Sequence, residues 1–152
     1  MNSPASPAEP FRHADLDGRP RAESNLSPQL PDRWAAGEPA ARATAALRKA
    51  WLCDDAGDSE QARRERTEAA WFLRMANRDG SPVNGHVSAD LALLADLLRR
   101  SSDCQGAIAV ALKGLAAVPP EGVGALLRFQ LDLARAGDEG RHDIGEALLA
   151  SD

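Results

Sequence analysis

Apolar residues recur every three to four positions from Ala40 to the C-terminus, which is the spacing of one face of an α-helix. Polar and turn-forming residues divide this region into six predicted helices, over residues 40–56, 59–77, 88–100, 104–118, 121–136 and 138–152. Ala and Leu, which are strong helix formers, supply most of the apolar positions, and β-branched residues are sparse. The pattern therefore predicts an all-α fold.

Residues at the predicted helix starts favour the same division. Pro39 suits the first turn of a helix, where its missing N–H group is not needed. Asp58 or Ser59, Ser88 and Asp138 each stand before a helical stretch. Their side-chain oxygens can accept hydrogen bonds from the free N–H groups of the first turn, so we expect them to be N-caps.

Residues at the predicted helix ends are equally distinct. Gly57 and Gly137 permit the left-handed conformation that commonly ends a helix. Pro119-Pro120 stops the fourth helix. Residues 78–87, RDGSPVNGHV, contain two turn-forming dipeptides and predict a loop between the second and third helices.

Each predicted helix has an apolar face that we expect to be buried. The positions are Ala62, Ala69, Phe72, Leu73 and Ala76 in the second helix; Val87, Leu91, Leu94 and Leu98 in the third; Ala107, Ile108, Ala111, Leu112 and Leu115 in the fourth; Val123, Leu126, Leu127, Leu131 and Leu133 in the fifth; and Ile144, Ala147 and Leu148 in the last. Only 4% of the chain is aromatic, so the predicted core is built mainly from Ala and Leu.

A small residue followed by aspartate marks three predicted helix junctions, Gly57-Asp58, Ser102-Asp103 and Gly137-Asp138. With these junctions the chain resembles tetratricopeptide repeat (TPR) proteins, whose helix-turn-helix unit recurs every 34 residues. Small residues of that family match Ala62 and Ala69 in the first unit and Ala107 in the second, and Pro119 matches a repeat end. The third unit departs from the family at His142. The resemblance implies antiparallel helix pairs over about residues 40–150.

Three segments are also similar to the helical C-terminal half of an uncharacterised bacterial family whose N-terminal half is rich in cysteine. They are AALRKAWLCDDAGD, DLLRRSSDCQGAI and LLRFQLDLARAGDEGRHDIGEAL, and DLDGRP at residues 15–20 looks like a fragment of the N-terminal half. The paired Cys-x-x-Cys elements of that family are absent from this chain. The resemblance therefore implies a helical fold and no zinc-binding function.

Residues 1–38 form a proline-rich arm ahead of a helical domain at residues 39–152. Proline removes a backbone donor and blocks helix continuation, so we expect the arm to lack regular structure. Two alternatives follow: a disordered tail, or an arm pinned to the helical body by its apolar residues. These residues are Phe11, Leu16, Leu26, Leu30 and Trp34.

Charge and targeting signals restrict the possible partners and compartments. The formal net charge is −5, whereas a nucleic-acid binder usually presents a basic face, so we expect no nucleic-acid partner. The first residues lack the basic and apolar regions of a signal peptide, and no apolar run reaches the length of a membrane span. We therefore expect a cytoplasmic protein that does not bind a membrane.

No catalytic or metal-binding motif is present. A nucleophile needs a base within hydrogen-bond reach, yet His13, His86 and His142 belong to no GxSxG or HExxH pattern. Cys53 and Cys104 are far apart, so they indicate neither a disulfide framework nor the closely spaced ligand pair of a structural zinc site. We expect no enzyme activity, no cofactor and no metal.

Charged residues on the predicted helices have two interpretations. Glu60 with Arg64 and Asp96 with Arg100 have the i, i+4 spacing of favourable pairs on a solvated helix face. The acidic residues between positions 54 and 58 could bind a cation or a basic partner. Alternatively, Asp58 caps the second helix and the other two are solvated.

The TPR resemblance implies a partner surface on the concave side, lined by the first helix of each pair. The residues are Leu47, Trp51, Asp54 and Asp55 from the first helix, Ala92, Asp96, Arg99 and Arg100 from the third, and Leu127, Leu131 and Arg135 from the fifth. Trp and Arg are common binding hot spots. We therefore expect a protein-interaction module that binds a peptide or partner protein, with Trp51 packing an apolar side chain and the arginines binding carboxylates.

Several alternatives to this partner surface remain. In the first, Trp51 belongs to the core and the arginines are solvated. In the second, the arm itself covers the concave side. In the third, the chain is a small-molecule-binding regulatory or accessory subunit, and in the fourth it assembles as a homo-oligomer.

Overall fold

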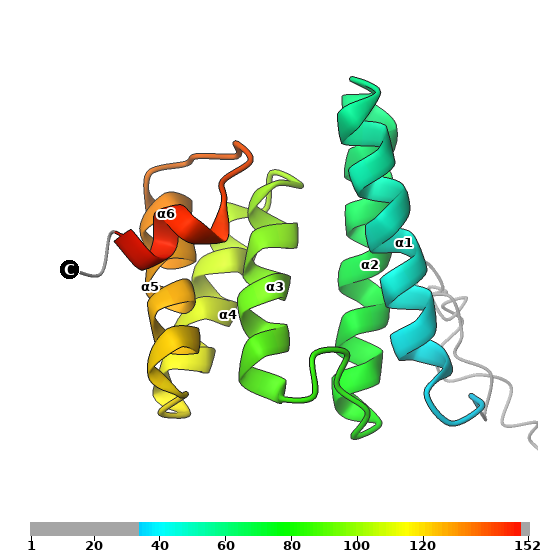
Figure 1. The fold of residues 1–152 in the computed structure, drawn as a ribbon, viewed down its shortest axis with the longest axis horizontal. Coiled ribbons are helices and arrows are strands. Elements are labelled where there is room, and N and C mark those ends of the chain that lie inside the picture. Colours follow the sequence, from blue (N-terminus) through cyan, green and yellow to red (C-terminus); the bar gives the residue numbers. More distant parts are fainter. Residues whose placement is uncertain (1–33, 150–152) are drawn as a thin grey trace, which may run out of the picture. The chain divides into compact units, whose positions relative to one another are not determined.

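The computed structural model describes residues 34–149, and this part of the chain is all α-helical. Its six helices are α1 (Glu38–Asp55), α2 (Ser59–Arg78), α3 (Val87–Arg99), α4 (Cys104–Ala116), α5 (Glu121–Arg135) and α6 (Ile144–Leu149) (Figure 1). No strand occurs between residues 34 and 149, so the predicted all-α class and the number of helices are confirmed. Within the same range, no helix is both long and apolar enough to cross a membrane.

The helical body begins at Trp34, a few residues before α1. The indole ring of Trp34 packs edge-on against Phe72 of α2, with 6.0 Å between the ring centroids. The guanidinium of Arg42 on α1 lies 5.0 Å from the centre of the same indole ring. Trp34 therefore contacts both α1 and α2, the helix pair that we call the first hairpin. The other apolar residues of the predicted arm lie outside the described residues: Phe11, Leu16, Leu26 and Leu30.

The three small-residue–Asp junctions share one backbone geometry. Gly57, Ser102 and Gly137 all have a left-handed backbone, with φ of 76°, 69° and 68°. In each junction the small residue donates its N–H to the carbonyl three positions back, and the following Asp donates its N–H to the carbonyl five positions back. This is the Schellman motif, which satisfies the last carbonyls of a helix. The predicted ends of the first and fifth helices are thus confirmed.

Asp58 and Asp103 then start the next helix, as the junction pattern predicts for Asp58. Asp58 accepts a hydrogen bond from the N–H of Gln61 at 3.1 Å, and Asp103 accepts one from the N–H of Gly106 at 2.8 Å. Each carboxylate satisfies one of the free donors in the first turn of its helix. The same tight turn therefore connects α1 to α2 and α3 to α4.

Two predicted helix starts are wrong. α3 begins one residue before Ser88, and its N-cap is His86, whose Nδ1 accepts the Ser88 N–H at 3.2 Å. After α5, Asp138 accepts the N–H of Gly140 at 2.7 Å, and α6 starts only at Ile144. The carbonyls of Asp138 and Gly140 both accept hydrogen bonds from the guanidinium of Arg99. Residues 138–143 are not helical, and their carbonyls at positions 138 and 140 are bound from α3 and not by a helix of their own.

The buried faces largely follow the predicted periodicity. All five predicted positions of α2 are buried, as are Leu91, Leu94 and Leu98 of α3, Ala107 and Ala111 of α4, Leu127 and Leu131 of α5, and Ala147 of α6. Five other predicted positions are only partly buried: Ile108, Leu115, Val123, Leu126 and Leu133. Val87, Leu112 and Ile144 are exposed, so the prediction is wrong for these three. The side chain of Leu148 lies outside the described part.

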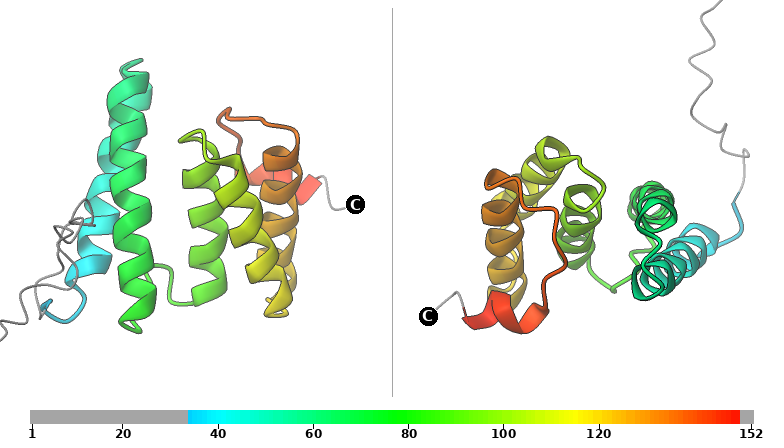
Figure 2. Two further views of the ribbon diagram at one scale, coloured as in Figure 1. Left: turned by 180° about the vertical axis from the view of Figure 1, so that it is seen from behind. Right: turned by 90° about the horizontal axis from the view of Figure 1, so that it is seen from above.

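The helices pack around α3. This helix contacts α2, α4 and α5, and it is buried on almost every side because its sequence is apolar on almost every side. α1 packs on α2 and does not pack directly on α3. α6 lies across α5. α1 and α6 both lie on the near side in Figure 1, and α3 is set back between them (Figure 2, right). In its helix packing, the third pair, α5 and α6, thus differs from the pairs α1–α2 and α3–α4.

Candidate functional site

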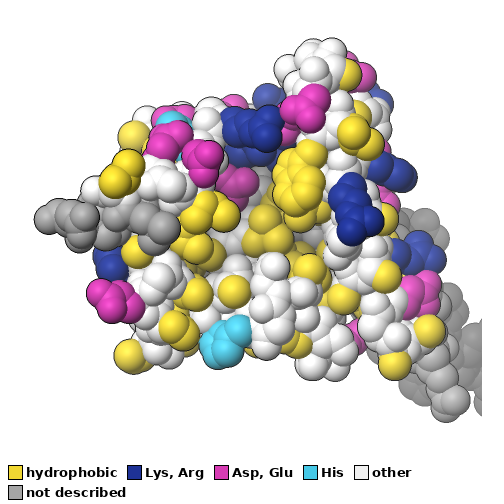
Figure 3. Space-filling view, in the orientation of Figure 1, with side chains coloured by type: hydrophobic (Ala, Val, Ile, Leu, Met, Phe, Trp, Pro, Cys, Tyr) yellow, Lys and Arg dark blue, Asp and Glu magenta, His cyan; other side chains and the backbone are white. Residues whose placement is uncertain are grey.

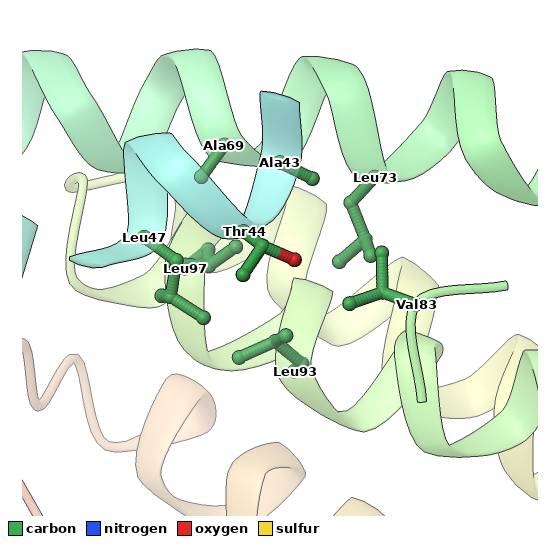
Figure 4. A pocket seen from close by; sticks show the side chains of 8 residues that line it. All are labelled: Ala43, Thr44, Leu47, Ala69, Leu73, Val83, Leu93 and Leu97. Carbon is green, nitrogen blue, oxygen red and sulfur yellow. The ribbon is translucent and has the colours of Figure 1, made fainter. Parts of the chain in front are cut away.

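A groove opens between α1 and α3, with α2 as its floor. Eight residues line it: Ala43, Thr44 and Leu47 from α1, Ala69 and Leu73 from α2, Val83 from the α2–α3 loop, and Leu93 and Leu97 from α3 (Figure 4). We call this the α1–α3 groove. It is shallow: the space within it that admits the centre of a water-sized sphere is about 10 Å³. The groove exists because α1 and α3 both pack on α2 but not on each other.

The lining of the α1–α3 groove is almost entirely apolar. Thr44 is the one polar side chain in it, and its hydroxyl donates a hydrogen bond to the carbonyl of Ala40 at 3.0 Å. Figure 3 shows hydrophobic side chains gathered on this face between α1 and α3, where the surface is hollowed. Trp51 lies one helical turn beyond Leu47 on α1 and keeps 46% of its surface exposed. Of the predicted partner residues, Leu47 and Trp51 therefore belong to an accessible apolar surface.

Asp54 joins the first hairpin to the end of α3. Its Oδ1 accepts a hydrogen bond from Arg66 Nη1 at 2.8 Å, and its Oδ2 accepts one from Arg100 Nη2 at 2.7 Å. Burial raises the pKa of Asp54, but the hydrogen bonds and positive charges of Arg66 and Arg100 outweigh it, so the pKa lies below its usual value. The predicted pair of Asp96 with Arg100 is wrong because Arg100 turns to Asp54. The other predicted pair, Glu60 with Arg64, is present.

Arg99 is a structural residue, which corrects its predicted place on an open partner surface. The whole residue is buried, at 0% exposure. Its guanidinium donates hydrogen bonds to Gln130 Oε1 at 3.0 Å and Asp96 Oδ1 at 2.8 Å, and to the carbonyls of Asp138 and Gly140. These hydrogen bonds require the several N–H donors of a planar guanidinium, which among the side chains only arginine has. Arg99 therefore holds the segment after α5 against α3. Four of its five N–H donors are used within the chain, and the buried side chain is not accessible to a partner's carboxylate.

The remaining predicted partner residues do not form one surface. Leu127 and Leu131 of α5 are buried in the core, as is Ala92 of α3, which corrects their predicted exposure. α6 packs on α5, so the concave position over that helix is already occupied. Arg135 is exposed at the end of α5. The accessible apolar part of the predicted surface is therefore limited to Leu47 and Trp51 on α1.

Residues 138–143, which we call the strap, connect α5 to α6 and reach back to the first hairpin. Arg141 Nη1 lies 3.2 Å from Asp55 Oδ1, and Glu139 Oε2 lies 4.0 Å from Arg63 Nη2. The Ser102 hydroxyl also donates a hydrogen bond to Glu139 at 2.9 Å. All the charged side chains in these two pairs are about half exposed or more, so each pair contributes little to stability.

His142 stands between two carboxylates within this segment. Its Nδ1 lies 2.8 Å from Glu146 Oε2 and its Nε2 lies 2.9 Å from Asp138 Oδ2, while its ring packs edge-on against Phe129. The hydrogen bond with Glu146 is the main cause that raises the pKa of His142, with Asp138 adding to it against a smaller effect of burial. The carboxylates thus favour an imidazolium that donates to both. This arrangement anchors the strap to α6 and α5.

Sequence reasoning missed Leu93, Leu97 and Asp90. The periodicity assigned α3 a single buried stripe, whereas the run LALLADLL is apolar all round and serves several neighbours. Asp90 is fully buried and accepts hydrogen bonds from the backbone N–H groups of Val83 and Asn84 at 2.8 and 2.9 Å. The sequence signal that could have indicated the role of Asp90 is an acidic residue in the first helical turn after a loop containing Asn-Gly. Asp90 places Val83 at the end of the groove.

Comparison with known proteins finds no family model, no curated protein and no solved structure that matches the chain. Among residues 34–149, no group of three or more His, Cys, Asp or Glu side chains is arranged to hold a metal ion.

Proposed function

We propose that this chain is a non-enzymatic protein-interaction module that binds a segment of a partner protein in the α1–α3 groove. The observation that carries the proposal is an apolar hollow, bordered by the half-exposed Trp51, between two helices that do not pack on each other. Contiguous exposed apolar surface on a folded domain is typical of interaction sites, and Trp51 extends the apolar surface beside this hollow. Trp is also among the residues that most often dominate binding energy.

The hollow is shallow, so a protein partner would bind across its rim and would not fill a deep pocket. Three apolar lining residues remain partly accessible, Leu47, Val83 and Leu93, and Trp51 lies one turn beyond Leu47. Full burial of one Leu, Ile or Phe side chain of the partner contributes about 1.5–3 kcal/mol before the costs of association. Contacts with Trp51 would add to this. The expected complex is therefore of modest affinity.

A small-molecule ligand is less well supported. Sites for small molecules commonly have volumes of about 300–1,000 Å³ and a few convergent polar groups that orient the ligand. The α1–α3 groove is smaller, and the hydroxyl of Thr44 is already directed to a backbone carbonyl. The lining can therefore bury an apolar group, but it offers no free polar group that would orient a small-molecule ligand.

Site-specific photo-crosslinking tests the proposal. A photoreactive phenylalanine analogue replaces Leu47 in the groove, and in a matched control it replaces Leu52, which is exposed elsewhere on α1. In cells that express the chain, we expect the probe at position 47 to capture a defined partner protein and the probe at position 52 not to. Capture that is equal at both positions, or absent at 47, would refute binding in the groove.

A further inference from the structure

We propose that the occupant of the α1–α3 groove is an amphipathic α-helix of the partner, with acidic residues beside its apolar stripe. This inference rests on the proposed function, because it specifies what kind of segment the groove accepts. Four features of the structure support it: the polarity of the lining, the spacing of apolar side chains on α1, the short helix α6 on the same side of the molecule, and the charge next to the groove.

The polarity of the lining favours a helical ligand over an extended one. Every backbone N–H and C=O group that a ligand buries needs a hydrogen-bond partner. Extended peptides find theirs in a sheet edge or in polar side chains of the receptor. In the α1–α3 groove the only polar side chain is Thr44, and its hydroxyl donates to Ala40. A helix pairs its backbone groups internally, so it can offer only apolar side chains to such a surface.

Accessible apolar side chains stand at helical spacing on the α1 side of the groove. Leu47 of the lining and Trp51 are one turn apart on α1. On α3, Leu93 is partly accessible, whereas Leu97, one turn further on, is buried. Side chains four positions apart lie on the same face of a helix, one turn above the other. Two ligand side chains at i and i+4 would therefore contact Leu47 and Trp51 at successive turns of α1.

The chain itself shows that a short helix can lie on this side of the molecule. α6 packs across α5 and buries Ala147 to 1% exposure. It lies on the same side of α3 as α1 does (Figures 1 and 2). The partner helix would extend this inner layer from α5 to α1 and α3. That continuity is a third reason to expect a helix in the groove.

Charge beside the groove selects the polar edge of the partner helix. Arg48 follows Leu47 on α1, is exposed, and forms no ion pair with any side chain in the range 34–149. Asp55, the nearest exposed acid on α1, is engaged by Arg141 of the strap. A partner with Asp or Glu next to its apolar stripe can pair with Arg48, whereas a basic partner would be repelled.

Selection from a displayed library of random peptides tests the inference. Peptides of about 15 residues, roughly four helical turns, are selected on the full chain and synthesised. We expect apolar residues at i and i+4 with acidic neighbours, and a gain of helical circular dichroism on binding. We expect Leu93→Glu to weaken binding about tenfold or more, and Arg48→Glu to weaken it severalfold with the fold unchanged. Leu112→Glu, at an exposed position on α4 outside the groove lining, should leave binding unchanged.

The outcomes separate the two proposals. Selected peptides that lose affinity with Leu93→Glu or Arg48→Glu but bind without becoming helical overturn the helical partner and leave the groove as a binding site. Peptides that bind all three variants equally, or a library that yields no binder, overturn both proposals. Circular dichroism of each variant shows whether it is folded. Arg48 is exposed, so its variant keeps the test valid if Leu93→Glu fails to fold.

Discussion

Replacing Arg99 by alanine is the sharpest test of the packing described here. The residue has no exposed surface, and its guanidinium serves Gln130, Asp96 and two strap carbonyls. Removing one member of a buried charged network costs about 3–5 kcal/mol, because its partners remain buried without hydrogen bonds. The total stability of a small domain is about 5–15 kcal/mol. We therefore expect Arg99→Ala to remove a large fraction of the free energy of unfolding.

Urea denaturation followed by far-ultraviolet circular dichroism measures this loss. Arg99→Lys is the informative second variant, since it keeps the positive charge but lacks the planar fork that reaches several acceptors at once. We expect it to lie between the wild type and Arg99→Ala. Arg135→Ala provides a matched control, because this arginine is exposed at the end of α5. Its effect should stay within about 0.5 kcal/mol.

A different outcome would reverse the assignment of Arg99. If Arg99→Ala and Arg135→Ala both remain within about 0.5 kcal/mol of the wild type, Arg99 does not anchor the strap. The guanidinium would then be free to serve the concave surface, where the sequence pattern first placed it. A loss that appears only as faster hydrogen exchange in the strap would restrict the role of Arg99 to that segment.

Three further predictions concern titration and close packing. The free energy of unfolding should fall as the pH drops through about 4 and below, because the folded pKa of Asp54 lies under its unfolded value of about 3.9. In urea titrations, Asp54→Asn should make the free energy of unfolding less dependent on pH in this acidic range. His142 should titrate by NMR above its unfolded pKa of about 6.5, so that its contribution is complete below that value and is lost at higher pH, and Glu146→Gln should lower the pKa. Gly114→Ala should destabilise the fold by about 1–3 kcal/mol in urea denaturation because its Cβ would lie 2.8 Å from leucine methyl groups of α5, whereas Gly122→Ala, with no atom within 4 Å, should be neutral or slightly stabilising.

The sequence predicted the helices well because their ends are encoded locally. The Schellman turns at Gly57 and Gly137 need only a small residue and its immediate neighbours. The cap at Asp58 likewise involves a donor three residues away. Such signals can be recognised in a short stretch of sequence without knowing what packs against it.

The same local signal failed at Asp138, where a distant residue decides the structure. The junction before it has the geometry of the other two, yet the chain that follows is not helical and its carbonyls at Asp138 and Gly140 accept hydrogen bonds from Arg99. Arg99 and Asp138 are 39 positions apart in the chain. No short sequence pattern carries this information, so the start of the last helix could not be placed correctly.

The groove was hidden for a related reason. Periodicity tells which residues share a helix face, but not which neighbour covers that face. Leu131 and Leu47 both belonged to predicted inner faces; the first is covered, and the second borders an open hollow. The difference depends on α1 and α3 standing apart while Asp54 ties α1 to Arg100 at the end of α3. An opening that is defined by a missing helix–helix contact and held by a long-range ion pair can be recognised only in three dimensions.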